Sequence, residues 1–244
     1  MITFPSLCQC VCVSVVNIVD VVLPPEPKTR EQLLQCESLY CEVTNSLFLL
    51  PLLTIPLEIY SNSRSNQRLD SCQLTLDPNT AHRHLSLSEG NRKVTYTDQV
   101  QPYPDHPDRF TTWYQVLCRE GLSGRCYWEV EWSGGAGIGV TYKGISRRGG
   151  VNDCWLGHND KSWSLFCSDN RYRAWHNNNP TTIDVPSSSS HRVGVYLDWP
   201  AGTLSFYRAS SDTLTHLITF TSTFTEPLYP GFRVYDGGDS VSLK

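Results

Sequence analysis

The sequence has no strong excess of charge of either sign. Its 244 residues include 20 Lys and Arg against 24 Asp and Glu, a formal net charge of −4 at pH 7. The basic residues do not gather into a polybasic arm. Nucleic acids and acidic membrane surfaces attract proteins through a positive field, so the sequence predicts neither as a partner.

Long uninterrupted apolar runs are also missing. The stretch Val11–Leu23 is broken by Asn17 and Asp20, and no Lys or Arg precedes it. A second run, Leu47–Leu57, has 11 residues and contains two prolines. A helix needs about 20 apolar residues to cross a bilayer, and a secretory signal begins with a basic segment. We therefore expect no membrane segment and no signal peptide, and a cytoplasmic location.

The ten cysteines lack the spacing of a disulfide framework. Five precede Ser71, and five follow it: Cys72, Cys118, Cys126, Cys154 and Cys167. Small secreted domains carry even, regularly spaced sets, so we expect reduced, partly buried thiols in an intracellular protein. The series Cys8, Cys10 and Cys12 has no second Cys or His pair at zinc spacing. We expect no metal and no cofactor.

From Cys72 onward the sequence lacks a sustained helical period. Short strand-like runs are instead separated by turn residues about every 8–12 positions, which is typical of an all-β sandwich or barrel. The predicted strands are Gln73–Leu76, Leu85–Ser88, Lys93–Thr97, Gln115–Cys118, Arg125–Trp132, Ala136–Tyr142, Ser162–Cys167, Arg171–Trp175, His191–Asp198, Thr203–Arg208, Leu214–Phe220, Leu228–Val234 and Ser240–Leu243.

A tryptophan-rich stretch, residues 124–142, is the predicted centre of this fold. Trp128 and Trp132 fall on one face of a strand, because strand side chains alternate with period 2. Ser133–Gly135 is a turn signal, after which Ala136–Tyr142 returns as a glycine-rich strand. We predict a β-hairpin whose two large rings require an opposing sheet.

Two further features support a packed β structure. Asp198–Gly202 predicts a tight hairpin turn in which Gly202 adopts a positive φ. Six aromatic residues are predicted to pack in the core or against turns rather than to contact a partner. They are Trp128, Trp132, Trp163, Trp199, Phe206 and Phe232.

Four motifs give the region a resemblance to the B30.2 domain, also called PRY-SPRY. In order they are Leu76–Ala81, Gly124–Trp132, Val193–Tyr207 and Pro227–Phe232. The sequence of these motifs is especially similar to the B30.2 domains of fish tripartite-motif proteins and fish NLR receptors. The resemblance covers residues 71–244, with the PRY part at 71–122 and the SPRY part at 123–244. It implies a concanavalin-like jelly roll, a sandwich of two antiparallel sheets.

The sequence pattern of residues 1–70 is not typical of a folded domain. Leu23–Gln32 resembles the segment that often precedes such a domain, but Cys36–Asp70 resembles no part of the family. We expect a linker followed by an insertion, irregular and mostly disordered. No RING, B-box, coiled-coil or NACHT segment is recognisable, so we expect no ligase activity from this chain.

Candidates for catalysis are weak. Glu129 and Glu131 place carboxylates about 6.5–7 Å apart along one strand, which overlaps the spacing of inverting glycosidases, yet such a pair is more often the wet side of a sheet. The Gly135–Gly139 stretch is not followed by the helix that a phosphate loop requires, and glycine there favours close packing against tryptophan rings. The nearest Cys and His pairs are Cys154 with His158 and Cys167 with His176.

The polar connections carry the side chains that dominate protein interfaces, namely Tyr, Trp and Arg. By resemblance, Phe166 and Ser168 match positions of partner contact, and Gly137 matches another and would form a floor. The residues predicted to contact a partner are Tyr103, Asp105, Arg109, Gly137, Arg147, Phe166, Ser168, Arg171, Tyr172, Arg173, Trp175, Arg233 and Tyr235.

The resemblance implies a non-catalytic recognition module that binds a target protein through loops at one end of the sandwich. Its setting would be innate immunity or substrate selection by a ubiquitin ligase. The alternative is a lectin-like sandwich that binds a glycan or small molecule, since sugars also stack on aromatic rings.

Overall fold

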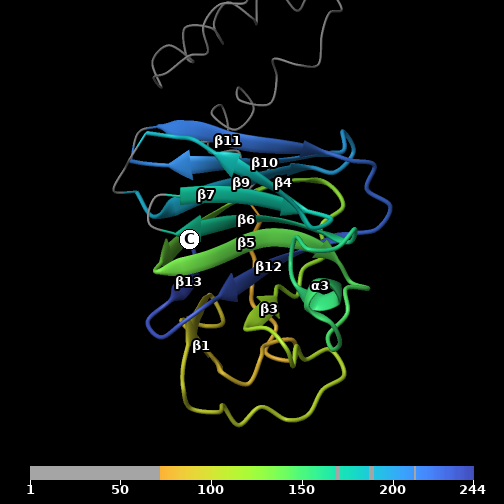
Figure 1. Cartoon of the computed structure of the whole chain (residues 1–244), viewed down its shortest axis with the longest axis vertical. Helices are drawn as coiled ribbons and strands as arrows, with labels where there is room; N and C mark the ends of the chain where they lie inside the picture. The colour runs from red at the N-terminus through yellow and green to blue at the C-terminus, as the bar shows by residue number, and fades with distance from the viewer. Residues whose placement is uncertain (1–71, 169–170, 187–189, 212) are drawn as a thin grey trace, which may run out of the picture. The chain divides into compact units, whose positions relative to one another are not determined.

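The structure is a computed structural model that describes residues 72–168, 171–186, 190–211 and 213–244. The predictions made for residues 1–70 lie outside the described residues. Within them, the strands form two antiparallel sheets (Figure 1). The predicted all-β sandwich is therefore confirmed.

The first sheet has seven strands. In spatial order they are β1 (Leu85–Ser88), β2 (Lys93–Tyr96), β13 (Ser240–Leu243), β4 (Arg125–Ser133), β9 (Arg192–Asp198), β10 (Thr203–Ala209) and β11 (Leu214–Thr221).

The second sheet has six strands. In spatial order they are β3 (Gln115–Leu117), β12 (Leu228–Val234), β5 (Gly135–Tyr142), β6 (Ser162–Ser168), β7 (Arg171–His176) and β8 (Asn179–Ile183). A short helix, α3 (Val151–Cys154), lies beside one end of β5 and β12 (Figure 1).

Most predicted strands form within a residue or two of their expected bounds. One predicted strand is absent, and two short elements were not predicted. Gln73–Leu76 is not a strand and contributes only a bridge from Leu76 to Cys118. Strand β8 was missed because its residues are mostly exposed and include Pro180, so it lacks the alternation of a half-buried strand. Helix α3 was missed because a single turn of four residues is too short to show a period.

The predicted central hairpin does not exist, because β4 and β5 belong to different sheets. Strand β4 pairs with β13 and β9, whereas β5 pairs with β12 and β6. The chain passes between the sheets at Gly134, which has φ +69°, and a Cβ there would overlap the Asp239 carboxylate. The turn signal is real, but it marks a corner between sheets.

The alternation predicted for β4 is confirmed. Trp128, Val130 and Trp132 lie on one face of the strand and are buried between the sheets. Glu129 and Glu131 lie on the other face and are partly or fully exposed. The other aromatic residues assigned to the core or to turns also pack as expected, with Trp199 donating its indole N–H to the Glu226 carbonyl. The Asp198–Gly202 turn joins β9 to β10, and Gly202 has φ +71°.

The expectation of reduced cysteines is wrong for one pair. Cys72 and Cys126 form a disulfide, with their Cα atoms 5.7 Å apart, which joins the first described residue to β4. The sequence spacing gave no sign of this, because the two residues are separated by 54 positions. The other described cysteines, Cys118, Cys154 and Cys167, are free and buried as expected.

The disulfide predicts a specific peptide map. Trypsin cuts after Arg68 and Arg125, so without reduction peptide 69–83 should remain joined to peptide 126–143. Reduction should separate the two masses. Recovery of both peptides as free, alkylated thiols from unreduced protein would show that the bond is absent in solution.

Candidate recognition surface

One row of side chains crosses the whole second sheet on its outer face. Cross-strand partners share a face of a sheet, and the alternate positions, such as Ile138 and Leu165, fill the core. The row consists of Gln115, Arg233, Gly137, Phe166, Arg173 and Thr182, one residue from each strand. The register thus brings four of the predicted contact residues together.

A second row completes this outer face. Gly135, Ser168 and Arg171 are cross-strand partners, two positions along from the first row. Arg171 and Arg173 are exposed, while Phe166 and Ser168 are partly exposed. Together with Thr182–Pro186 they line a groove of about 750 Å³. The groove therefore offers a partner both basic and apolar side chains.

Tyr172 also lines the groove, but its side chain is almost fully buried. It lies between two exposed arginines on β7, so the alternation of a strand turns it toward the core. It is only 1 % exposed and lies opposite Cys167. Burial raises the pKa of its hydroxyl to about 12. Tyr172 therefore offers a partner far less surface than Arg171 and Arg173, and the period of the strand could have indicated its burial.

Arg233 is the centre of an aromatic cage formed with Trp113, Trp155 and Tyr235. Its guanidinium carbon lies over the three rings at 4.3, 3.9 and 4.3 Å from their centroids. The residue is 6 % exposed, yet its Nε and Nη1 have no hydrogen-bond partner. Burial lowers the pKa of Arg233 to about 10, so the group remains charged at neutral pH.

The floor of the cage is Gly137. A Cβ there would lie 3.2 Å from the Arg233 Cβ and 3.5 Å from the Tyr235 hydroxyl. The space left by the missing side chain of Gly137 is filled by Arg233 and Tyr235. The sequence predicted tryptophan rings against this glycine-rich stretch instead. Phe166 meets the Tyr235 ring edge-on at 5.1 Å, and so connects the cage to the groove.

A stack of rings extends the cage along the sheet. His158 lies between Trp155 and Trp175, with centroid distances of 3.8 and 4.3 Å. Burial lowers the pKa of His158, and the nearby Arg233 charge adds to the effect. The predicted Trp175 is thus partly buried against His158 rather than standing alone.

Three residues of this surface were not predicted: Trp113, Trp155 and His158. Trp113 lies two residues before β3, and Trp155 follows α3. Trp155 and His158 lie within the long polar connection between β5 and β6, where binding residues are frequent. That placement could have indicated them, but only the folded register shows that Trp113 and Trp155 meet, at 4.7 Å.

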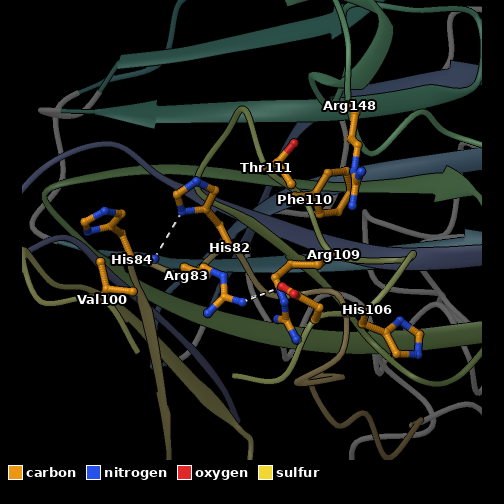
Figure 2. A pocket seen from close by; sticks show the side chains of 10 residues that line it. His82, Arg83, His84, Val100, His106, Arg109, Phe110, Thr111 and Arg148 are labelled. Atoms are coloured by element: carbon orange, nitrogen blue, oxygen red, sulfur yellow. Dashed lines mark hydrogen bonds and ion pairs between the residues drawn. The ribbon is translucent and has the colours of Figure 1, made fainter. Parts of the chain in front are cut away.

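The predicted PRY residues lie around a separate pocket of about 250 Å³ (Figure 2). Figure 2 shows His82 and His84 side by side at one side of it and His106 at the other. Asp105 pairs with Arg83 at 2.6 Å in this pocket. Tyr103 does not line it and donates its hydroxyl to the Leu85 carbonyl.

Arg109 and Arg147 are occupied by the protein's own backbone. Arg109 is 3 % exposed and donates to the carbonyl oxygens of Pro78, Ala81 and Pro104 at 2.6–2.8 Å. Arg147 donates in the same way to three carbonyl oxygens of the neighbouring loops. Both arginines therefore hold loops in place.

His82 is expected to make the free energy of unfolding fall at acid pH. Its Nδ1 accepts the backbone N–H of His84, and burial, with the charges of His84 and Arg109, lowers its pKa from 6.5 to about 4. The neutral form is favoured in the folded protein, so this contribution is complete above pH 6.5 and is lost as pH falls toward 4. Because the ring is partly exposed, solvent screening reduces the loss to on the order of 1 kcal/mol. Urea unfolding at both pH values should show a smaller loss for His82→Gln, and an equal loss would contradict the assignment.

The described residues offer no catalytic arrangement. Glu129 accepts the Tyr127 hydroxyl and pairs with Arg192, while Glu131 pairs with Lys244. Burial raises the pKa of the Cys154 and Cys167 thiols, the opposite of an activated nucleophile. No group of three or more His, Cys, Asp or Glu in the described part of the chain could hold a metal ion. No helix there is long and apolar enough to cross a membrane.

Comparison with known families gives two matches in sequence. The SPRY-associated domain, PRY, matches residues 74–122, and the SPRY domain matches residues 125–243. This chain belongs to the PRY-SPRY, or B30.2, family. SPRY domains of tripartite-motif proteins are protein-interaction modules and not catalytic domains.

Relatives of two kinds share this PRY-SPRY domain. Stonustoxin subunit beta of Synanceia horrida is 48 % identical over 172 residues, which is 70 % of this chain and 24 % of the toxin subunit. Tripartite motif-containing protein 16 of Mus musculus is 43 % identical over 165 residues, 66 % of this chain and 29 % of that protein. The chain thus spans about a quarter of the length of such relatives.

Solved structures agree with the fold. The TRIM65 PSpry domain is 29 % identical with a TM-score of 0.65, covering 82 % of this chain and 98 % of that one. The stonustoxin structure is 48 % identical with a TM-score of 0.66, covering 72 % of this chain and 27 % of that one.

Proposed function

We propose that this chain is a non-catalytic protein-recognition module whose partner binds the outer face of the second sheet. The observation that carries the proposal is the row from Arg233 to Arg173, in which arginines and partly exposed rings lie side by side. Tyr, Trp and Arg are the residues that dominate interface hot spots. The proposed surface is a sheet face, whereas the family resemblance predicts loops at one end of the sandwich. The pocket in the PRY part shares no lining residue with the groove on this face.

A photo-crosslinking amino acid placed at position 173 tests this surface. The matched control carries it at Glu131, an exposed residue of β4 in the other sheet. We expect a protein adduct from position 173 that is absent from position 131. With the partner then purified, Phe166→Ala and Arg173→Ala should each weaken binding about tenfold or more. Equal adducts from both positions, or unchanged affinity, would refute the site.

The biological setting is a finer proposal. Kinship with tripartite-motif proteins supports a role in innate immunity or in substrate selection by a ubiquitin ligase, in the cytoplasm. Kinship with fish toxin subunits supports a different setting for the same domain. Fractionation of cells that express the native gene distinguishes the two, because a cytoplasmic role requires the protein in the cytosolic fraction.

The groove supports one alternative. Its volume of about 750 Å³ lies within the range of about 300–1,000 Å³ found for ligand pockets, and Phe166 offers a ring on which a sugar could stack. A glycan array probed with the full chain tests a lectin-like function. Binding to defined glycans that is lost in Phe166→Ala would favour it, and an array without specific signals would dismiss it.

A further inference from the structure

The charge of Arg233 has no counter-ion in the described structure. No ion pair among the described residues includes it. The nearby Asp239 accepts hydrogen bonds from the backbone N–H groups of Tyr235 and Asp236 instead. A buried charge with unmet hydrogen bonds is costly, and rings compensate for only part of that cost. A group that supplied the missing acceptor would recover it.

The cage can be approached from outside. Trp113, Trp155 and Tyr235 are each only partly buried, so the edges of the rings reach the surface. The guanidinium atoms enclosed without partners are Nε and Nη1, and Nη2 is not among them. A partner that lies on the rings is therefore within reach of one edge of the guanidinium.

The surroundings select the chemistry of that partner. Because the guanidinium carbon lies over three ring faces, the N–H groups left to a partner lie at the edge of the group. A carboxylate accepts a charge-assisted hydrogen bond from such a group, here from Nη2, which is not enclosed. The exposed Arg171 and Arg173 on the same face extend the positive charge, although Asp184 at the groove opposes part of it. Charge complementarity therefore favours an acidic segment.

We propose that the partner protein supplies an Asp or Glu side chain whose carboxylate binds the guanidinium of Arg233. This inference rests on the recognition function proposed above and specifies its central contact. The residues flanking the acid pack on Trp113, Trp155 and Phe166, and Arg173 contributes long-range attraction.

Random peptides displayed on phage provide the probe, panned against the full 244-residue chain. Peptides that bind are synthesised, and each Asp or Glu is changed to Asn or Gln. We expect one acid in each tight binder whose amide version binds about tenfold more weakly or worse, since a charged hydrogen bond is lost. In Arg233→Lys, which loses the planar fork, the acid and amide versions should bind almost equally.

Arg173→Ala is the matched control, because it lowers the charge of the same face without touching the cage. It should weaken the acid and amide versions by similar factors. Thermal melts confirm folding, and Arg233→Met replaces Arg233→Lys if the lysine variant does not fold.

The outcomes separate this inference from the proposed function. Peptides that need Phe166 but tolerate every acid-to-amide change would refute the Arg233 contact and leave the surface standing. Failure to enrich any peptide also counts against the inference, while the photo-crosslink at position 173 still tests the surface by itself. Loss of both signals refutes both.

Discussion

Trp128→Ala is expected to lower the free energy of unfolding by about 3–5 kcal/mol, the usual cost of removing a large buried ring. Trp128 is 4 % exposed and lies on β4, the middle strand of the seven-stranded sheet. Strands β13 and β9 flank it on both sides, so the surrounding structure cannot close over the cavity. Urea unfolding measures the change, and a loss under about 1 kcal/mol would contradict the central place of this strand.

Two controls sharpen this test. The Trp128 Nε1 is buried without a hydrogen-bond partner, so Trp128→Phe removes an unsatisfied donor while keeping a ring. We expect it to cost about 1.5 kcal/mol or less. Val100 is 60 % exposed, and Val100→Ala should change stability by about 0.5 kcal/mol or less. A large loss of stability in Trp128→Ala alone would show that the cost comes from the buried ring, and not from removing any apolar side chain.

The strands could be predicted because their signal is local. Alternation on β4 follows from the period of 2 that every strand shares, and positive φ at Gly202 follows from turn chemistry. That β4 and β5 belong to different sheets could not be predicted in this way. Whether a turn closes a hairpin or crosses between sheets depends on distant residues, here Asp239 against Gly134.

The sequence predicted individual residues of the site but not their arrangement. A segment rich in Arg and aromatic residues indicated Arg173, and the family resemblance indicated Phe166. Arg233 was also among the predicted contacts. Their assembly into one row depends on the order β3-β12-β5-β6-β7-β8, in which strands far apart in sequence are neighbours. The disulfide between Cys72 and Cys126 escaped prediction for the same reason.

Arg109 and Arg233 show what composition cannot distinguish. Both were predicted to contact a partner, and both are more than nine-tenths buried. Arg109 is surrounded by carbonyl oxygens, whereas Arg233 is surrounded by rings. The sequence reveals neither environment, because each is built from segments that lie apart in the chain.

These two environments predict opposite results for the same substitution. Arg109→Met would leave three carbonyl oxygens without their donor, of which that of Ala81 is buried. We expect it to lower the free energy of unfolding by about 3–5 kcal/mol. Arg233→Met removes a buried charge whose Nε and Nη1 have no partner. Replacing such a group by a hydrophobe of similar volume is often neutral or stabilising, although three ring contacts worth about 0.5–2 kcal/mol each are lost.

We therefore expect Arg233→Met to stay within about 1 kcal/mol of the unchanged protein in urea unfolding, while it loses binding to acidic peptides. A loss as large as that of Arg109→Met would show that Arg233 serves the fold, and the proposed contact would then lack its physical basis. A stable variant without binding has the opposite meaning. Natural proteins retain residues that do not improve stability where function requires them, and an arginine kept unpaired among rings is explained by the partner that pairs it.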